Sequence, residues 1–122
     1  MDRESLQNRL VEFAVLTVNT VIRHNKDENL KNLNDQVIRS STSVALNYGE
    51  ARSAGSKRDF VHKISTVLKE LRETKVNLTI ISRLSNKSIP DVFQRLIREN
   101  DELIAIFHRT LQTTRKNMDK IK

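Results

Sequence analysis

The side chains of this sequence that are best suited to chemistry are its cationic ones. The chain has 22 Lys and Arg residues against 15 Asp and Glu residues, which gives a formal net charge of +7. Clustered Lys and Arg side chains bind phosphate oxygens through ionic contacts that depend little on base sequence. A net positive charge is informative about partners rather than about fold. The excess therefore points to an anionic partner.

Residues that could serve catalysis or metal binding lack the spacing that such chemistry needs. His24, His62 and His108 form no H-x-x-x-H or H-E-x-x-H pattern, so we expect solvated surface histidines. Glu70 and Glu73 would need a neighbouring histidine to make a carboxylate metal site, and we expect them to pair with basic groups instead. With no cysteine and no glycine-rich phosphate loop, the sequence favours a protein that is not an enzyme and binds no cofactor or metal.

The elements that must position the cationic residues are four amphipathic helices. Apolar residues recur at spacings of three and four, which predicts helices over about residues 3–24, 30–52 and 57–84 and a fourth that ends near 121. The breaks between them are residues 25–29, 53–56 and 85–88. Two glycines and one proline leave little turn material for a β fold.

Three of these helix ends carry recognisable capping residues. We expect Gly55 to end the second helix in a left-handed conformation. Ser56 with Asp59 predicts the start of the third helix, because a serine at the N-cap bonds an N–H of the first turn. Ser88, with Pro90 in the first turn, predicts the start of the fourth helix.

Short connections between amphipathic helices favour antiparallel neighbours. The predicted fold is therefore all-α, an oligomeric antiparallel up-down-up-down four-helix bundle with a single domain over residues 1–122. No stretch approaches the roughly 18 apolar residues of a membrane span. Since a signal-peptide pattern and cysteine are also missing, we expect a cytoplasmic protein without a membrane partner.

Such a bundle gathers the start of the first helix, the second connection and the end of the fourth helix at one end. Arg3 belongs to this end. The residues that we expect to contact an RNA or DNA backbone are Arg52, Lys57, Arg58, Lys63, Arg115, Lys116, Lys120 and Lys122. A solvated, Lys-rich surface without a partner explains the same cluster, and the sequence leaves both readings open.

The first helix has a second apolar face. Val11, Val15, Val18 and Ile22 follow spacings of four, three and four, and they are rotated away from the stripe that contains Leu10. Wider burial by neighbouring helices would explain this face. Exposed aliphatic stripes more often mark partner surfaces, so we favour an oligomer interface. As an alternative function, the face belongs to a protein–protein scaffold or adaptor that binds an amphipathic helix and no nucleic acid.

The second helix contains an unusual run of small polar residues at 39–45, Arg-Ser-Ser-Thr-Ser-Val-Ala. Serine and threonine are poor helix formers, but their small size permits close approach of a neighbouring helix. Gly49 extends this series. No G-x-S-x-G elbow and no suitably spaced histidine accompany it, so we interpret the run as a close-packing seam rather than a nucleophile site.

Four segments of the second and third helices resemble a known pattern. They are residues 39–44 (RSSTSV), 47–51 (NYGEA), 56–60 (SKRDF) and 68–74 (LKELRET). They resemble the bacterial four-helix bundle proteins called 23S ribosomal RNA intervening-sequence proteins, whose pattern is R-S-x-x-S-[IV]-x-x-N-x-x-E, then S-x-x-[DE]-F and L-x-E-L-x-E-T. Tyr48 and Gly49 replace the usual Ile-Ala, and Ala51 replaces the usual Gly.

The resemblance implies an α-helical bundle that assembles into a homo-oligomer, more specifically a pentamer, with an unknown biochemical activity. A similar bundle is the accessory protein of diversity-generating retroelements, where it binds nucleic acid and a reverse transcriptase. No catalytic residue carries over. Asn47 and Glu50 match the polar pair of the pattern, without an assigned role.

Overall fold

The computed structural model describes residues 1–84 and 91–121 of the 122-residue chain. Its helices are α1 (Arg3–His24), α2 (Lys31–Arg52), α3 (Lys57–Leu84) and α4 (Asp91–Ile121), with a short 3-10 turn η1 (Glu28–Leu30) before α2. Residues 1–84 and 91–121 contain no β-strand. The all-α class and the helix bounds expected from the sequence are confirmed.

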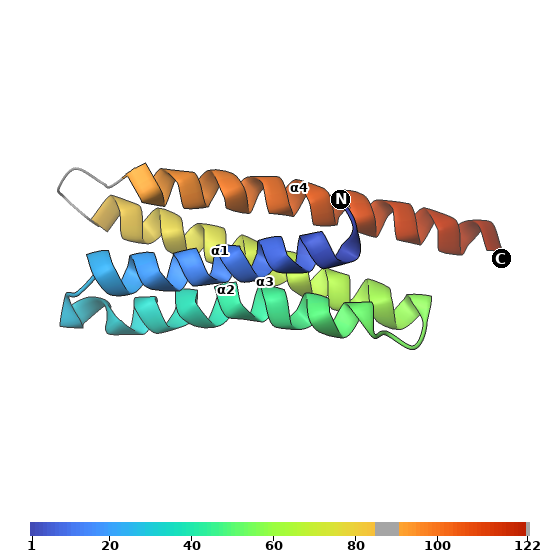
Figure 1. Ribbon diagram of the computed structural model, residues 1–122, viewed down its shortest axis with the longest axis horizontal. Helices are drawn as coiled ribbons and strands as arrows, with labels where there is room; N and C mark the ends of the chain where they lie inside the picture. The colour runs from blue at the N-terminus through green and yellow to red at the C-terminus, as the bar shows by residue number, and fades with distance from the viewer. Residues whose placement is uncertain (85–90, 122) are drawn as a thin grey trace.

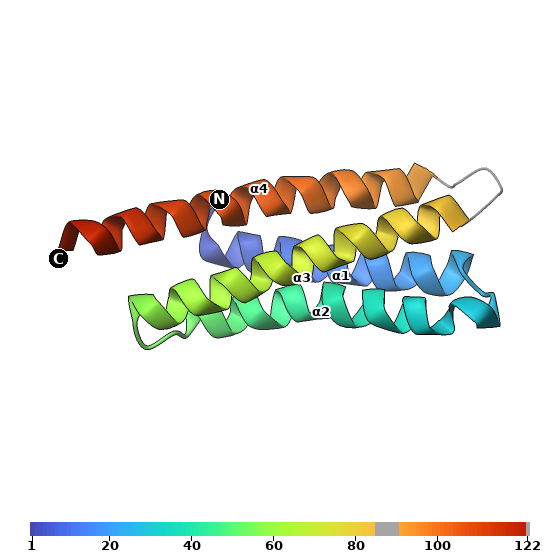
Figure 2. The same cartoon turned by 180° about the vertical axis from the view of Figure 1, so that it is seen from behind.

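The four helices lie side by side in a packing that fits a helical bundle (Figures 1 and 2). In Figure 1 the chain runs from right to left along α1 and α3, and from left to right along α2 and α4. Helix α2 lies against both α1 and α3, and α4 packs mainly on α3. Helix α4 continues past the ends of the other helices, so its last turns project from the bundle (Figure 1).

Local hydrogen bonds define the helix ends. Asp2 caps α1 by accepting from the Ser5 N–H at 2.7 Å. Ser56 accepts from the Asp59 N–H at 3.0 Å, as the capping pattern predicts. The prediction for Gly55 is wrong, since no glycine in the described ranges has a positive φ. The Ser53 and Ala54 N–H groups bond carbonyls three residues back instead, at 3.1 Å, which closes α2 without a left-handed residue. Ser88 and Pro90 lie outside the described residues.

Each helix contributes one apolar stripe to the core. The largest side chains with less than 2% of their surface exposed come from all four helices: Leu10, Val21, Val37, Val44, Ile64, Leu71, Leu78, Ile81, Phe93, Leu96, Leu103 and Phe107. The rings of Tyr48 and Phe107 meet edge to face with centroids 5.4 Å apart. Phe60 is half-buried, at the edge of this core.

The small residues of α2 form the expected close-packing seam. Ser40 and Ser41 are fully buried, and the Ser40 and Thr74 hydroxyls are 2.8 Å apart across the α2–α3 contact. On the side of α1, Gln7 donates to the Ala45 carbonyl at 3.0 Å. Gly49 does not extend the seam as expected, because a Cβ added there would lie 3.5 Å from the Gln7 Oε1, which is ordinary van der Waals contact.

Ion pairs connect helices at the bundle surface. Arg39 of α2 pairs with both Glu70 and Glu73 of α3, with its Nη1 3.3 Å from a Glu70 oxygen, so the expected role of these glutamates is confirmed. Between α1 and α4, Arg9 holds Glu99 with two bonds of 2.8 and 2.6 Å. Arg9 also reaches Glu102 at 3.1 Å.

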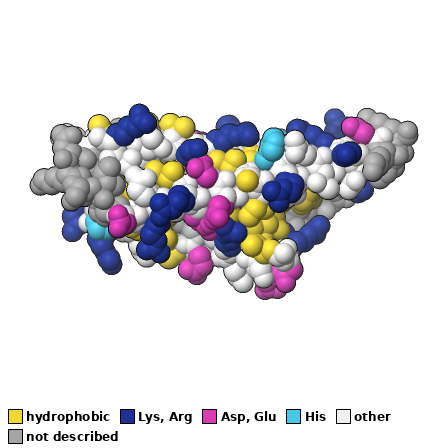
Figure 3. Space-filling view, turned by 90° about the horizontal axis from the view of Figure 1, so that it is seen from above, with side chains coloured by type: hydrophobic (Ala, Val, Ile, Leu, Met, Phe, Trp, Pro, Cys, Tyr) yellow, Lys and Arg dark blue, Asp and Glu magenta, His cyan; other side chains and the backbone are white. Residues whose placement is uncertain are grey.

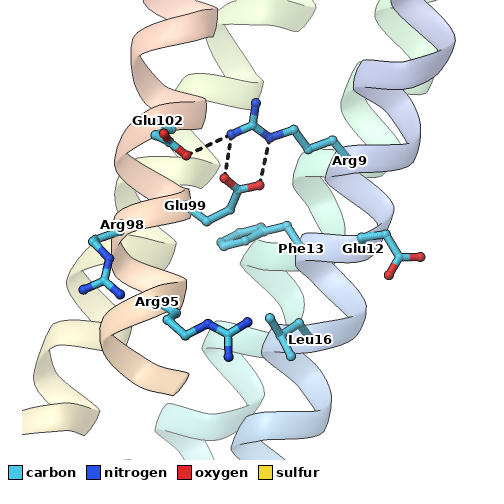
Figure 4. A pocket seen from close by; sticks show the side chains of 8 residues that line it. All are labelled: Arg9, Glu12, Phe13, Leu16, Arg95, Arg98, Glu99 and Glu102. Carbon is cyan, nitrogen blue, oxygen red and sulfur yellow. Dashed lines mark hydrogen bonds and ion pairs between the residues drawn. The ribbon is translucent and has the colours of Figure 1, made fainter. Parts of the chain in front are cut away.

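The Arg9 contacts form one wall of a groove between α1 and α4 (Figure 4). Phe13 lies on the side of the ion pair that faces Arg95 and Leu16 (Figure 4). The hydrogen bond from Arg9 lowers the pKa of the Glu99 carboxyl and raises that of the Arg9 guanidinium. Sequence reasoning missed this pair because its members are 90 residues apart.

We expect Thr74→Val to lower the free energy of unfolding by about 1 kcal/mol, because it removes a hydroxyl that is buried in the α2–α3 seam. Chemical denaturation measures this value. Thr66→Val is a matched control on the same helix, since in the described residues the Thr66 hydroxyl bonds the His62 carbonyl of its own helix, at 3.2 Å, and nothing across the seam. The control should change stability by less than about 0.5 kcal/mol. Equal losses in the two variants would contradict a special role for the seam.

The α1–α4 ion pair predicts a pH-dependent stability. The folded-state pKa of Glu99 lies below its ordinary value of 4.5, so the stabilisation is complete above about pH 4.5 and is lost as the pH falls through the folded-state value. The wild type should therefore lose about 1 kcal/mol more than Glu99→Gln on acidification, measured by denaturation at each pH.

Glu12→Gln is the control for this experiment, because Glu12 lies beside the same groove and has no ion pair in the described part of the chain. It should keep the wild-type pH dependence. Asp2, whose pKa is also lowered, titrates in all three proteins, so only the differences between them are informative. A wild type and a Glu99→Gln variant with parallel curves would rule out the stabilising pair.

Candidate nucleic-acid interface

Three segments that are distant in the sequence meet at one end of the molecule. The start of α1, the connection from α2 to α3, and the C-terminal part of α4 lie at the right of Figure 1. We call the exposed cations of these segments the basic end: Arg3, Arg52, Lys57, Arg58, Arg115 and Lys116. These cations come from all four helices and lie outside the buried apolar cluster.

A pocket of about 380 Å³ lies between the three segments. It is lined by Arg3, Ala51, Arg52, Ala54, Gly55, Ser56, Lys57, Phe60, Thr114 and Asn117. The cations among these residues come from α1, α2 and α3, whereas Thr114 and Asn117 come from α4. Among the described residues, no carboxylate lines it.

Two arginines converge at this pocket. The Arg3 guanidinium carbon lies 5.9 Å from the centroid of the Phe60 ring, a cation–π distance. Burial raises the pKa of the Tyr48 phenol, while the nearby charges of Arg3 and Arg52 lower it. Both guanidinium groups are therefore within electrostatic reach of the same hydroxyl.

The predicted phosphate-binding residues differ in whether they form an ion pair. In residues 1–84 and 91–121, the side chains of Arg52, Lys57, Arg58, Arg115 and Lys116 are exposed and form no ion pair. Lys63 differs, because its Nζ lies 2.9 Å from a Glu50 oxygen, which raises the Lys63 pKa. The side chain of Lys120 and the whole of Lys122 lie outside the described part of the structure.

The two residues of the polar pair have different partners. Asn47 donates to the Ser43 carbonyl of its own helix at 2.8 Å. Glu50 reaches across to Lys63 on α3. Their side chains thus serve local structure, one within α2 and one between α2 and α3.

The second apolar face of α1 is not covered within the chain. Val11, Val15 and Ile22 have 42%, 48% and 61% of their surface exposed, and Val18 is half-buried. Leu46 of α2, 69% exposed, extends the face. A shallow apolar groove runs along it, with Ala14, Thr42 and Ala45 among its lining residues. Wider burial by neighbouring helices is therefore excluded as the explanation for this face.

A second exposed apolar strip was not found from the sequence. Val76, Ile80 and Leu84 of α3 are 57%, 42% and 53% exposed. Their spacing of four, offset from the buried stripe that contains Leu78 and Ile81, is the signal that could have revealed them. We call these three residues the α3 strip, and Val11, Val15, Val18, Ile22 and Leu46 the α1–α2 strip.

Cationic side chains also occur away from the basic end. The face in Figure 3 carries Lys and Arg along much of its length, among hydrophobic patches and fewer acidic groups. Arg95 and Arg98, beside the α1–α4 groove, are exposed members of this wider set. The positive charge is therefore not confined to one end, and what distinguishes the basic end is the pocket where cations from three helices converge.

Other site chemistry has little support in the described ranges. His24, His62 and His108 are exposed, as expected for surface histidines. No group of three or more metal-binding side chains occurs in residues 1–84 and 91–121. Among the described helices, none combines the length and the apolar character needed to cross a bilayer.

Comparisons with known proteins place the chain in a family. Among solved structures, a protein of unknown function from the S23 ribosomal protein family of Bacteroides thetaiotaomicron VPI-5482 has a TM-score of 0.76 and 26% sequence identity. That match covers 86% of this chain and 96% of the other. No curated protein matches the sequence. The family model described as 23S rRNA-intervening sequence protein matches residues 6–109, which is most of the chain. The chain therefore belongs to the 23S rRNA-intervening sequence protein family.

Proposed function

We propose that this protein is a non-enzymatic, homo-oligomeric bundle of antiparallel helices that binds the backbone of RNA or DNA through its basic end. One observation carries the proposal: cations from α1, α2, α3 and α4 gather there without ion-pair partners in the described residues. Lys and Arg contacts to phosphates release counterions, and this release supplies most of the affinity of sequence-independent binding.

The aromatic residues support backbone contact rather than base recognition. Phe13, Tyr48, Phe93 and Phe107 are buried in the core, and Phe60 is half-buried beneath Arg3. Recognition of single-stranded bases relies on exposed aromatic rings on which bases stack. Since these rings are engaged in packing, affinity should come from phosphates and depend strongly on salt.

A salt titration of oligonucleotide binding tests this proposal. In fluorescence anisotropy, log affinity should fall with log salt by roughly 0.7–0.9 for each phosphate neutralised. The triple variant Arg58→Gln/Arg115→Gln/Lys116→Gln should bind more weakly, with a slope shallower by about 2.

The control removes the same charge elsewhere. Arg23→Gln/Arg95→Gln/Arg98→Gln replaces three exposed cations near the end of α1 and the start of α4. This variant should keep most of the wild-type affinity and slope. Absence of binding at low salt, or equal losses in both triple variants, would rule out the basic end as the binding surface.

The oligomer part of the proposal rests on the two apolar strips. The α1–α2 strip and the α3 strip lie on different helices, with α1 nearer the viewer in Figure 1 and α3 nearer in Figure 2. A two-fold contact between like strips would leave the other strip of each copy exposed. A head-to-tail contact between unlike strips covers both in every copy when the rotation between copies closes the assembly into a ring. A ring of five is the state implied by the resemblance stated above.

The change Val15→Asp should reduce the solution mass, because it places a charge in the centre of the α1–α2 strip. Val18→Asp tests the same strip at a half-buried position. Sedimentation velocity measures the mass, and circular dichroism verifies folding. Leu16→Asp is the matched control on the same helix, since Leu16 is 41% exposed but lines the α1–α4 groove.

An unchanged mass for Val15→Asp would show that this face is not an oligomer contact. The apolar groove along the face would then favour the alternative role, in which an amphipathic helix of another protein binds there.

A further inference from the structure

The pocket at the basic end has the composition of a phosphate site. Arg3, Arg52 and Lys57 line it from three different helices, and no Asp or Glu of residues 1–84 and 91–119 lines it with them. Its volume of about 380 Å³ is at the small end of the range for ligand sites. Three cations around one recess create a strongly positive local potential, which an anion inside the recess would relieve.

Two acids near the pocket have partners outside it. The Asp2 carboxylate accepts the Ser5 N–H at 2.7 Å, and this hydrogen bond is the main reason why the Asp2 pKa is lowered. Asp2 is not among the described residues that line the pocket. Glu50, next to the pocket residue Ala51, pairs with Lys63. The positive charge of the recess is therefore not cancelled by a carboxylate of its own lining.

The two arginines are positioned by their surroundings. Arg3 is the first residue of α1 and lies over the Phe60 ring, while Arg52 is the last residue of α2. Both residues line the same pocket, each from the end of its own helix. Guanidinium groups bind phosphate with planar, paired donors, so a site with two of them favours phosphate over a simple halide.

Helix α4 supplies the polar wall of the pocket. The Thr114 hydroxyl donates to the Thr110 carbonyl at 2.8 Å, which leaves its oxygen free to accept a hydrogen bond. Asn117 is exposed and can both donate and accept. These groups suit a sugar hydroxyl attached to the phosphate.

We propose that this pocket binds the terminal phosphate of a nucleic-acid strand, with Arg3, Arg52 and Lys57 around the phosphate and the attached sugar toward Thr114 and Asn117. The inference rests on the proposed function, because the rest of the basic end then binds the internal phosphates of the same strand. A terminal phosphate carries close to two charges at neutral pH and is attached on one side only. It therefore fits a recess lined by three cations better than an internal phosphate, which has one charge and chain on both sides.

The test compares one oligonucleotide in three forms: with a 5′-phosphate, with a 3′-phosphate, and with hydroxyl groups at both ends. Binding is measured by competition against an internally labelled strand at fixed salt. At least one phosphorylated form should bind roughly tenfold more tightly than the unphosphorylated one, the gain expected from about one charge-assisted hydrogen bond. Arg3→Gln/Arg52→Gln should reduce this ratio to about one.

The control is Arg58→Gln/Arg115→Gln, which removes the same charge from the basic end outside the pocket lining. It should weaken all three oligonucleotides alike and keep the ratio. If the pocket variant does not fold, as judged by circular dichroism, Lys57→Gln is used in its place and should also lower the ratio.

The outcomes separate the two proposals. Binding of all three forms with equal affinity would overturn the terminal-phosphate site and leave the proposed function standing. No binding of any form at low salt would overturn both. Adenosine monophosphate that binds as tightly as the phosphorylated strand would show that the pocket takes a free nucleotide, and the strand-end assignment would be wrong.

Discussion

Burial of one apolar stripe from each helix is the constraint on which the rest of this structure depends. A fully buried aliphatic or aromatic side chain contributes about 1.5–3 kcal/mol relative to an exposed one, and all four helices contribute several such residues. Leu10, Val44, Leu71 and Phe107 belong to these stripes. Turning any helix about its axis would expose its stripe. The rotation of each helix is thereby fixed, and with it the direction in which every charged side chain leaves the surface.

The small residues of α2 determine how closely the helices approach. Ser40 and Ser41 are fully buried although they are poor helix formers, and the Ser40 hydroxyl meets Thr74 across the α2–α3 contact. Larger side chains at these positions would push α2 and α3 apart and weaken the packing between them. The Arg39 ion pairs with Glu70 and Glu73 lie next to this seam, so the close approach also brings their charges together.

Helix positions could be predicted from the sequence because periodicity and capping residues are local signals. The Ser56 cap illustrates this, since its partner Asp59 is three residues away. The end of α2 could not be predicted in the same way. Its last carbonyls are satisfied by the Ser53 and Ala54 N–H groups, and either this arrangement or a left-handed glycine satisfies them equally well.

The site could be predicted only in outline, because contacts between distant segments depend on helix rotation. The topology of short connections was enough to bring the α2–α3 connection and the C-terminal part of α4 to one end. It did not indicate that Lys63 is paired with Glu50, or that Arg9 joins α1 to α4 through Glu99. The α3 strip was missed for a similar reason. Residues such as Val76 have the spacing of core positions and are revealed as surface residues only when the buried stripe is known.

The same constraint leaves several cations of the basic end without ion-pair partners in the described residues. Lysine and arginine keep their charge in water on long side chains, so they are stable at helix ends that border the core. Two acids of this region have partners close by: Asp2 caps α1 and Glu50 pairs with Lys63. These two carboxylates therefore have partners at a helix N-terminus and on a neighbouring lysine. Arg3, Arg52 and Lys57, in contrast, line a recess in which no described residue contributes a carboxylate. The positive potential of the recess therefore depends on which cations have a carboxylate partner in the fold. The net charge of the sequence does not reveal this.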